Sequence, residues 1–260
     1  MHLPSKAQVK FWTGLTSVKY RREEGLFLAE GAKIVKEALR SGWEIEALLV
    51  WDDRRDRHEE LLEEVSGRIE CYSLPEKDWR RLSQDDTPEG LIAVVRARSI
   101  PAGDLTAERL AGRGPLLLLH RIGNPNNLGA ILRSADWFGF ETVLLSESSV
   151  DYTNPKTVRA SMGSLFHLNI AADLDFSTLV PSLRGHLHLI GSHVREGSVP
   201  HPCRRPAALV LGSESHGLPE PLLALMNERW LVPGKGCAES LSLPQAAAIM
   251  MYECTKGAGY

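Results

Sequence analysis

Four consecutive leucines at positions 116–119 place the strongest constraint on the fold of this chain. A strand with one face in water alternates apolar and polar side chains, whereas an unbroken apolar run is typical of a strand buried in a parallel sheet. Helical patterns separate this run from apolar segments at 142–146, 166–171, 187–193 and 207–212. The pattern predicts an α/β domain with a mostly parallel sheet covered by helices on both faces.

The first half of the chain predicts a smaller α/β unit. Its expected strands are 25–30, 45–51, 69–73 and 91–97, and its expected helices are 4–18, 32–41, 54–66 and 75–82, with a basic turn at 19–22. Residues 99–114 contain a proline, three glycines and few large side chains, which indicates an exposed linker with one helical turn at 107–111. We expect an N-terminal domain at 1–98, a linker at 99–114 and a second domain at 115–260. The helices of the second domain are expected at 127–138, 154–163, 218–227 and after residue 242, and its last strand at 230–232.

The charge of the chain does not by itself indicate nucleic-acid binding. The net charge is −3 and charged residues make up 24% of the chain, so a nucleic-acid site has to come from local patches. Candidate patches are 19–22, 80–81, Lys156 with Arg159, and 204–205. Each patch taken alone is also compatible with an ordinary solvated surface.

The four cysteines, at positions 71, 203, 237 and 254, are far apart and form no CxxC pair. This spacing predicts reduced thiols and no zinc site. The first twelve residues lack the apolar core of a signal peptide, and no apolar run approaches the length of a membrane span. We expect a soluble, cytoplasmic protein with neither a metal nor a membrane partner.

Three loops of the second domain follow expected strands and carry glycines with small polar side chains. Their sequences are NPNNLGAILR from residue 124, GSESHGL from residue 212 and VPGKGCAESLS from residue 232, the last leading into a helix with almost no polar face. Ligands of an open parallel sheet bind beyond the carboxyl ends of its strands, so these loops form the expected site. The patterns GxGxxG and GxxxxGK[ST] are absent, which argues against a nicotinamide dehydrogenase and a nucleoside-triphosphate hydrolase.

These loops resemble the three signature motifs of the SpoU (TrmH-like) family of RNA ribose 2′-O-methyltransferases, within the SPOUT class. The first loop matches through Asn127, Gly129 and Arg133, the second through Gly212, Glu214 and Gly217, and the third through Pro233 and then Ser240-Leu241 ahead of an alanine-rich helix. The resemblance spans about residues 115–260 and includes the stretch NPKTVRASMGSLFHLNI from residue 154. Residues 1–98 resemble, more loosely, a substrate-binding domain that is similar to small ribosomal RNA-binding proteins.

The resemblance implies a fold and a cofactor that the residue pattern alone does not. The C-terminal segment is expected to form a deep trefoil knot, and S-adenosylmethionine is the expected cofactor, held largely by backbone groups. The residues expected to bind it are Leu211, Gly212, Gly217, Val232, Pro233 and Leu241. The resemblance also implies a homodimer whose active site lies near the subunit contact, with Arg133 close to the partner chain.

By the same resemblance, the residues expected at the reaction centre are Arg133, Asn127, Glu214, Ser240 and Ser242. A ribose 2′-hydroxyl is a weak nucleophile at neutral pH, so it has to be oriented at the methyl carbon and lose its proton. The family assigns this work to the arginine matching Arg133. A guanidinium is effectively always protonated, so binding a phosphate and orienting the hydroxyl suits it better than acting as a base.

The remaining expected contacts support the reaction centre. Asn127 is expected to cap the helix after the first strand, and Glu214 to orient neighbouring groups through hydrogen bonds. The residues expected to contact RNA phosphates are Arg21, Arg22, Lys156 and Arg159.

The third motif departs from the family at one position. It usually continues Ser-Leu-Asn, whereas this chain has Ser242 in place of the asparagine. A serine hydroxyl is shorter than an amide and has one donor rather than two, so its contact with the ribose is expected to be weaker or bridged by water.

The sequence therefore predicts an S-adenosylmethionine-dependent 2′-O-methyltransferase that acts on structured RNA, with large-subunit ribosomal RNA as the first candidate. Two alternatives stay open. One is the same chemistry on transfer RNA, and the other is an RNA-binding or assembly protein that has lost catalysis, for which Ser242 is the motive.

Overall fold

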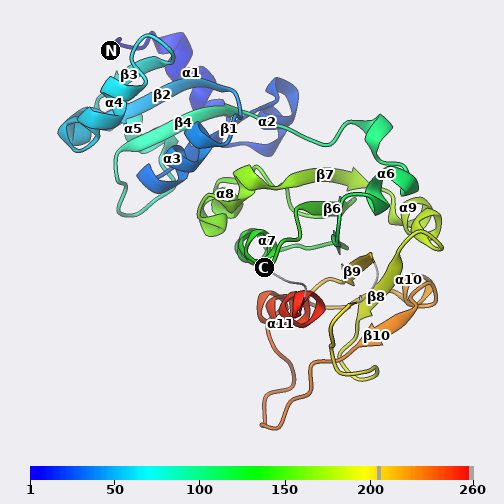
Figure 1. The fold of residues 1–260 in the computed structure, drawn as a ribbon. Coiled ribbons are helices and arrows are strands. Elements are labelled where there is room, and N and C mark those ends of the chain that lie inside the picture. The colour runs from blue at the N-terminus through cyan, green and yellow to red at the C-terminus, as the bar shows by residue number, and fades with distance from the viewer. Residues whose placement is uncertain (204–205, 258–260) are drawn as a thin grey trace. The chain divides into compact units, whose positions relative to one another are not determined.

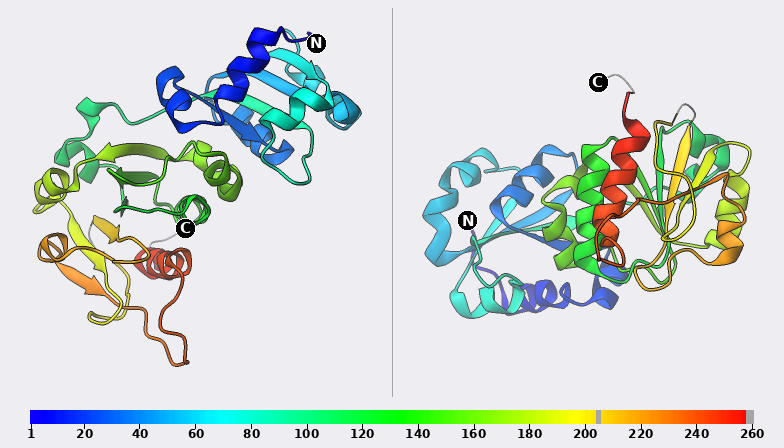
Figure 2. Two further views of the ribbon diagram at one scale, coloured as in Figure 1. Left: turned by 180° about the vertical axis from the view of Figure 1, so that it is seen from behind. Right: turned by 90° about the horizontal axis from the view of Figure 1, so that it is seen from below.

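The computed structural model describes residues 1–203 and 206–257, so the basic pair at 204–205 lies outside the described residues. The chain forms two compact units (Figures 1 and 2). Unit 1 comprises Met1–Arg98 together with Asp151–Phe166, and unit 2 comprises Ser99–Val150 together with the chain from His167 onward. A segment from the middle of the sequence therefore belongs to the N-terminal unit.

Unit 1 is built on a four-stranded mixed sheet. Its elements are α1 Lys6–Gly14, α2 Val18–Glu24, β1 Leu26–Glu30, α3 Ala32–Arg40, β2 Ile45–Trp51, the 3-10 helix η1 Asp52–His58, α4 Glu59–Glu64, β3 Glu70–Leu74, α5 Glu76–Leu82, β4 Leu91–Arg96 and α8 Pro155–Ser161. The strand order is β1-β4-β2-β3, with β4 antiparallel to β1 and β2, and β2 parallel to β3. Buried apolar side chains of α1, α5 and the strands form one core of this unit.

The sequence pattern was wrong about the start of unit 1. Residues 4–18 were expected to be one helix and 19–22 a turn, but α1 ends at Gly14 and a second helix, α2, covers the basic residues. A Cβ at Gly14 would lie 2.6 Å from the ring of Tyr20, so the close approach of α2 requires glycine there. Gly25 then ends α2 with a left-handed φ of 66°. The expected helix at 54–66 likewise forms as η1 followed by the short α4.

Segment 151–166 is tied to the rest of unit 1 by buried contacts. Arg21 forms an ion pair with Asp151, and the ring of Phe166 packs against Phe27 and Trp43. The hydroxyl of Tyr152 donates to the carbonyl of Arg98 at 3.1 Å. Sequence patterns report local structure, so they did not indicate this long-range association.

Unit 2 contains a six-stranded sheet in which every pairing is parallel. Its elements are the 3-10 helix η2 Ala102–Asp104, α6 Ala107–Ala111, β5 Leu116–Leu119, α7 Pro125–Trp137, β6 Thr142–Ser146, β7 Asn169–Leu174, α9 Phe176–Leu183, β8 His188–Ser192, β9 Ala207–Leu211, α10 Glu220–Leu223, β10 Glu228–Trp230 and α11 Leu243–Thr255. The strand order is β10-β8-β9-β5-β6-β7. The expected α/β class with a parallel sheet is confirmed.

The leucines of β5 divide between two helical layers. Leu116 and Leu118 belong to a core that includes the buried side chains of α6, α9 and α10. Successive strand side chains point to opposite faces, so Leu117 and Leu119 face the other way, where α7 and α11 lie side by side (Figures 1 and 2). All four leucines have no exposed surface, which explains why the run lacks a polar position.

Several boundaries in unit 2 differ from the sequence expectation. Residues 166–171 were expected to be one strand, but a 3-10 turn, Ser164–His167, comes first and β7 begins at Asn169. Helix α9 was not expected, and the expected helix at 218–227 is reduced to the single turn of α10. Strand β10 ends at Trp230, before the expected 230–232 segment is complete.

The stretch expected to be an exposed linker, residues 99–114, contributes to the core of unit 2. Ile100, Ala107 and Leu110 are buried, and the expected helical turn at 107–111 forms as α6. Pro101 precedes η2 and Gly112 ends α6, while three widely spaced apolar side chains of this stretch are buried. Composition averaged over the stretch hid those positions.

Candidate functional site

The motif loops after β5 and β9 meet at one edge of the unit 2 sheet. Strands β5 and β9 are parallel neighbours, and β5 continues to β6 on its other side. The backbone N–H of His120 donates to the carbonyl of Leu211 at 2.8 Å, so the pairing extends to the carboxyl ends of both strands. Strands β6 and β7 lie on the β5 side of this pair, and β8 and β10 lie on the β9 side. The pair is therefore the topological switch point of the sheet, where parallel sheets bind ligands.

Helix α7 begins directly beyond β5 and presents the first motif. Its cap is Asn124, whose side-chain oxygen accepts the backbone N–H groups of Asn126 and Asn127 at 2.9 and 3.3 Å. Asn127 was expected to be the cap, and this is corrected. Pro125 occupies the first turn, where it lacks only an N–H that has no helical partner, so the helix starts two residues earlier than expected.

The side chain of Asn127 is thereby released to cross to the second motif. Its Nδ2 donates to Oε1 of Glu214 at 2.8 Å, although the two residues are 87 positions apart. This contact joins the loops after β5 and β9. One carboxylate oxygen of Glu214 and the amide oxygen of Asn127 keep acceptor capacity, because Glu214 is exposed at this edge and Asn127 is only half-buried.

The second motif loop folds back on itself so tightly that it requires glycine. A Cβ added at Gly212 would lie 2.0 Å from the carbonyl carbon of Gly217 and 2.2 Å from its oxygen. Gly217 has a left-handed φ of 65°, and its N–H donates to the carbonyl of Ser213 at 2.9 Å. The result is a cradle of backbone directly after the fully buried Leu211.

The third motif loop lies apart from the other two. Residues 233–242 are exposed, and the loop projects away from the sheet as the orange-to-red segment before α11 (Figure 1). Within the described chain, no hydrogen bond joins Val232, Pro233, Ser240 or Leu241 to the loop from Gly212 to Gly217. Glycine and small polar residues dominate this loop, so it has too few apolar side chains to pack by itself.

Ser242 is the residue directly before α11. Its backbone N–H and its hydroxyl both donate to Oε1 of Gln245, at 3.3 and 3.1 Å, and Pro244 occupies the first turn of the helix. The serine that replaces the family asparagine therefore has a structural role at the start of α11.

Arg133 lies on the exposed side of α7, six residues beyond Asn127. At 1.5 Å per residue this places its Cα about 9 Å further along the helix axis. In the part of the chain that the structure describes, its guanidinium has no ion-pair or hydrogen-bond partner. A helix-surface arginine with no protein acceptor has its five donors available for a ligand.

Sequence reasoning missed His120 at the end of β5. Its Nδ1 is buried without a hydrogen-bond partner among the described residues, and its ring lies 5.8 Å from that of Phe176. Burial, reinforced by the positive charge of Arg121, lowers the pKa of His120 below its ordinary value of 6.5. Its position directly after a buried strand was the available sequence signal.

The four expected RNA contacts are placed very differently from one another. The side chain of Arg21 is 2% exposed, with Nη2 2.7 Å from Oδ2 of Asp151 and Nη1 donating to the carbonyls of Leu15 and Thr16. Its guanidinium is closed to a phosphate, so the expected RNA contact is corrected to a structural role in unit 1. The sequence showed the charge of the basic run but not which of its members is buried.

Two other members of the set lie on α8. Lys156 is exposed and has no ion pair in the described residues. Arg159 is 32% exposed, and its guanidinium already contacts the carbonyl of Gln84 at 2.6 Å and Oδ1 of Asp85 at 3.3 Å. Arg22 is exposed on α2.

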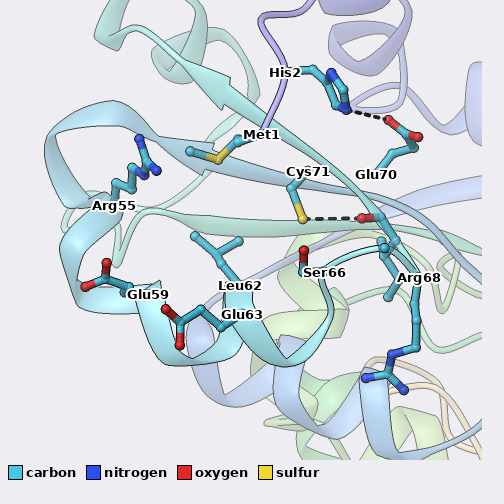
Figure 3. Close-up of a pocket in the computed structure, with 12 residues that line it drawn as sticks. Met1, His2, Arg55, Glu59, Leu62, Glu63, Ser66, Arg68, Glu70 and Cys71 are labelled. Carbon is cyan, nitrogen blue, oxygen red and sulfur yellow. Dashed lines mark hydrogen bonds and ion pairs between the residues drawn. The ribbon is translucent and has the colours of Figure 1, made fainter.

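A cavity of about 540 Å³ lies in unit 1, and none of the three motif loops contributes to its lining (Figure 3). It is lined by the N-terminus, η1, α4, residues 66–69 and the start of β3, and its charged lining residues are Arg55, Glu59, Glu63, Arg68 and Glu70. His2 is paired with Glu70 at 3.4 Å, and the thiol of Cys71 points to the Ile69 carbonyl. Its mixed charges and open mouth indicate a surface hollow rather than a second reaction centre.

Two negative findings concern the residues that the structure describes. Among them, no three His, Cys, Asp or Glu side chains are grouped so that they could hold a metal ion. No helix in this part of the chain combines the length and the apolar character needed to cross a bilayer.

Comparison with known proteins finds two family matches along the chain, and the C-terminal match runs through segment 151–166. Residues 115–252 match the SpoU rRNA Methylase family, and residues 6–93 match the MRM3-like substrate binding domain. The chain is 31% identical over 249 residues to the Bacillus subtilis 23S rRNA (guanosine(2553)-2′-O)-methyltransferase RlmP, with 94% of each chain covered.

Solved structures agree over nearly the whole length. A putative RNA methyltransferase of the TrmH family from Porphyromonas gingivalis superposes with a TM-score of 0.80 at 33% identity, covering 97% of this chain and 98% of that one. The SpoU methyltransferase AviRb from Streptomyces viridochromogenes, solved with the cofactor AdoMet, gives 0.81 at 25% identity, with 96% and 97% covered. The family match covers more than half of the chain and contains every motif residue described above, and the protein belongs to the SpoU rRNA methylase family.

Proposed function

We propose that this protein transfers the methyl group of S-adenosylmethionine to a ribose 2′-hydroxyl of ribosomal RNA. The observation that carries the proposal is the contact of Asn127 with Glu214, which joins the first and second family motifs at the switch point of the parallel sheet. The relatives that match over both units include an enzyme named for 2′-O-methylation of 23S rRNA. The cofactor is S-adenosylmethionine, since a matching member of the family was solved with it bound.

The second loop fits such a cofactor on physical grounds. A Cβ at Gly212 would overlap the carbonyl of Gly217, so only glycine lets this loop fold back so tightly, and the two glycines leave backbone groups uncovered by side chains at the end of β9. Leu211 and Gly217 border the cradle, and we propose Val232, Pro233 and Leu241 as the residues that cover the bound ligand. When bound there, S-adenosylmethionine supplies an electrophilic methyl group on a sulfonium.

The chain's own residues orient the ribose. We propose that Arg133 binds the phosphate next to the target nucleotide in a bidentate manner, because its five donors have no protein partner among the described residues. The Glu214 carboxylate, held by Asn127, provides an acceptor for the 2′-hydroxyl proton as the oxygen attacks. We propose that the hydroxyls of Ser240 and Ser242 contact the ribose directly or through water, with the Ser242 oxygen accepting while its hydrogen is donated to Gln245. Positioning of this kind lowers the barrier mainly by removing the entropy cost of alignment.

We propose that unit 1 binds structured RNA. Its residues 6–93 match a domain described as substrate binding, and exposed Arg22 and Lys156 offer cations to phosphates. Arg159 contributes more weakly, because Asp85 and the Gln84 carbonyl already engage its guanidinium. Removing any one phosphate-binding cation should reduce the slope of log affinity against log salt by about 0.7 to 0.9.

We propose a homodimer formed through α7 and α11. The side chain of Trp137 on α7 is 83% exposed, and Ile249 and Tyr252 on α11 are 38% and 41% exposed. The ring of Tyr252 contacts that of Phe138, the residue after Trp137, and α11 packs against α7, so exposed apolar side chains are present on both of these adjacent helices. Arg133 precedes Trp137 by one helical turn, so an interface at Trp137 would bring Arg133 close to the partner chain.

Two further properties are proposed from the family and the sequence. The segment from 231 to 257 threads a trefoil knot, supported by the return of α11 onto α7 after the third loop. A crystal structure in which the backbone path of the chain contains no knot would contradict this.

The protein works in the cytoplasm, supported by four cysteines that are all free. Its recovery from another fraction of the cell would refute the localisation.

The activity is tested with purified full-length protein, labelled S-adenosylmethionine and separate pools of ribosomal and transfer RNA. We expect label in large-subunit ribosomal RNA at a ribose, resistant to removal of the base. Label in transfer RNA alone would overturn the ribosomal assignment. Absence of label from both pools, with cofactor and RNA binding intact, would instead support the alternative that Ser242 marks a protein without catalysis.

Two variants test whether an absence of methyl transfer is caused by Ser242. Ser242→Asn restores the family residue, and the conservative Ser242→Thr keeps a hydroxyl at the start of α11. A protein inactive as isolated that gains label only as Ser242→Asn would show that the departure abolishes the reaction. A wild-type protein that is active in this assay removes the motive for the alternative.

A further inference from the structure

Two of the four cysteines, far apart in sequence, meet in unit 2. Cys203 lies before β9, Cys254 lies near the end of α11, and they are 51 positions apart. Their sulfur atoms are 2.7 Å apart, and the backbone N–H of Cys203 donates to the carbonyl of Cys254 at 2.9 Å. The backbone bond holds the two residues in register, so the thiol contact does not depend on side-chain rotation alone.

The pair differs from the other cysteines of the chain. Cys71 is partly buried against the Ile69 carbonyl in unit 1, and Cys237 is exposed in the third motif loop. Neither is in contact with another thiol among the described residues. The contact of Cys203 with Cys254 is therefore specific to this pair. Cys71 and Cys237 serve as controls in the same protein, because neither lies against another thiol.

The environments of the two thiols assign them different chemical roles. A hydrogen bond from Cys254 lowers the pKa of Cys203, outweighing its burial and the nearby Glu228 carboxylate. The same hydrogen bond, followed by burial, raises the pKa of Cys254 far above its ordinary value. Cys203 is also the more exposed of the two, so it is the thiolate that an oxidant meets first.

We propose that Cys203 and Cys254 form a reversible disulfide, a modification site that fastens α11 to the segment before β9. The oxidant is a peroxide. The Cys203 thiolate attacks one peroxide oxygen, the O–O bond breaks, and hydroxide leaves with a proton as water. The sulfenic sulfur of Cys203 is then attacked by Cys254, the S–O bond breaks, and a second water leaves as the S–S bond forms. Two thiols are oxidised and one peroxide is reduced.

Geometry favours this step over intermolecular pairing. A disulfide bond is about 2.05 Å long, so each sulfur has to move by only a few tenths of an ångström. A thiol that already lies against its partner has a very high effective concentration relative to any other thiol in solution. The cross-link also closes a covalent ring that contains the second and third motif loops.

The ring is expected to stabilise the fold without blocking the site. Both cysteines lie at the ends of β9 and α11 that are remote from the motif loops, since Cys203 precedes β9 and Cys254 lies in the last turn of α11. Closing a ring of this size restricts the unfolded chain and should raise Tm by about 4 °C or more. Cofactor affinity should change less than twofold. The inference rests on unit 2 alone and does not depend on the proposed methyl transfer.

The test begins with the full-length wild-type protein, titrated with hydrogen peroxide and then alkylated with N-ethylmaleimide under denaturing conditions. We expect two thiols to be lost together, a mass decrease of two hydrogens before alkylation, and a linked peptide pair containing Cys203 and Cys254. Dithiothreitol should restore four alkylated thiols. Linkage of Cys237 or Cys71 instead, or no linked peptide after full oxidation of exposed Cys237, would overturn the proposal.

Serine variants test the order of events. Cys254→Ser should leave Cys203 as a sulfenic acid that dimedone traps, and Cys203→Ser should slow oxidation of Cys254 at least tenfold. Cys237→Ser is the matched control and should keep the linked pair and the rise in Tm. Trapping of dimedone at Cys254 in the Cys203→Ser variant at the wild-type rate would contradict the assigned roles. The peptide mapping of the wild type stands even where a serine variant does not fold.

Discussion

At the residue scale, Gly212 is the position where the smallest change should have the largest effect on the site. A methyl group there would lie 2.0 Å from the carbonyl carbon of Gly217, so Gly212→Ala must displace the loop backbone. We expect affinity for S-adenosylhomocysteine to fall more than tenfold, measured by isothermal titration calorimetry. Gly103→Ala is the control, because a Cβ there meets nothing within 4 Å. Equal affinities for the two variants would rule out the backbone cradle.

Arg133 should separate binding from turnover. Its guanidinium is exposed on α7 and does not contribute to the protein's described ion pairs, so Arg133→Ala should leave folding and cofactor affinity nearly unchanged. We expect kcat to fall more than about a hundredfold, as for a group whose contacts form mainly in the transition state. Arg184→Ala, at another exposed arginine of unit 2, should keep full activity. A matching loss of cofactor affinity in Arg133→Ala would contradict this role.

His120 should make stability depend on pH in the mildly acidic range. The pKa of His120 is lowered in the folded protein, chiefly by burial. Below pH 6.5 the imidazole is therefore protonated in the unfolded chain while it is still neutral in the folded chain. The free energy of unfolding contributed by this residue is fully present above pH 6.5 and is lost as pH falls toward the folded pKa. Urea titrations at pH 7 and pH 5 measure it. His120→Asn should show a smaller loss, and parallel losses in both proteins would exclude His120 as the source.

At the scale of elements, the ion pair between α2 and the segment before α8 holds unit 1 together. Asp151→Asn would leave the 2% exposed guanidinium of Arg21 without its counter-charge. Breaking a buried pair from one side costs about 3 kcal/mol or more, so unfolding of unit 1 should shift accordingly in urea. The control is Glu76→Gln, which removes an exposed pair with Arg80 and should cost less than about 1 kcal/mol. Similar costs for both substitutions would show that segment 151–166 is held by its apolar contacts alone.

The elements also show where sequence reasoning succeeds. The unbroken leucine run of β5 predicted a buried parallel strand because no polar side chain could be accommodated on either face. The motif residues after β5 and β9 were placed correctly at one edge, because parallel strands bring their carboxyl ends together. Periodicity did not predict α9 or the end of α1 at Gly14, since the packing of Tyr20 against Gly14 involves a separate helix.

The candidate site was harder to predict for a related reason. Motif spacing identified Asn127 and Glu214, but their mutual contact needed the three-dimensional sheet. Local sequence could not distinguish buried Arg21 from exposed Arg22, because the difference depends on Asp151, which is 130 positions away. His120 escaped notice because its significance comes from burial at the strand end rather than from a motif.

At the scale of the whole molecule, the exposed apolar face of α7 and α11 argues for self-association. Trp137 on α7 is 83% exposed, and Ile249 and Tyr252 are partly exposed on the adjacent α11, so neighbouring helices both present large apolar side chains to solvent. Closed two-fold dimers use one patch on both subunits, so a single substitution acts twice at the interface.

The dimer is therefore tested most sharply by Trp137→Glu. Light scattering after size exclusion should give the wild type a mass near twice the 28.7 kDa of the chain, and the variant a mass near that of one chain. Val199→Glu is the control, because it places the same charge on a 61% exposed valine remote in sequence from both helices. The monomeric variant should keep its fold and cofactor affinity but lose most methyl transfer, since Arg133 lies one turn from the disrupted contact. A dimeric Trp137→Glu protein, or a fully active monomer, would show that the reaction does not require this interface.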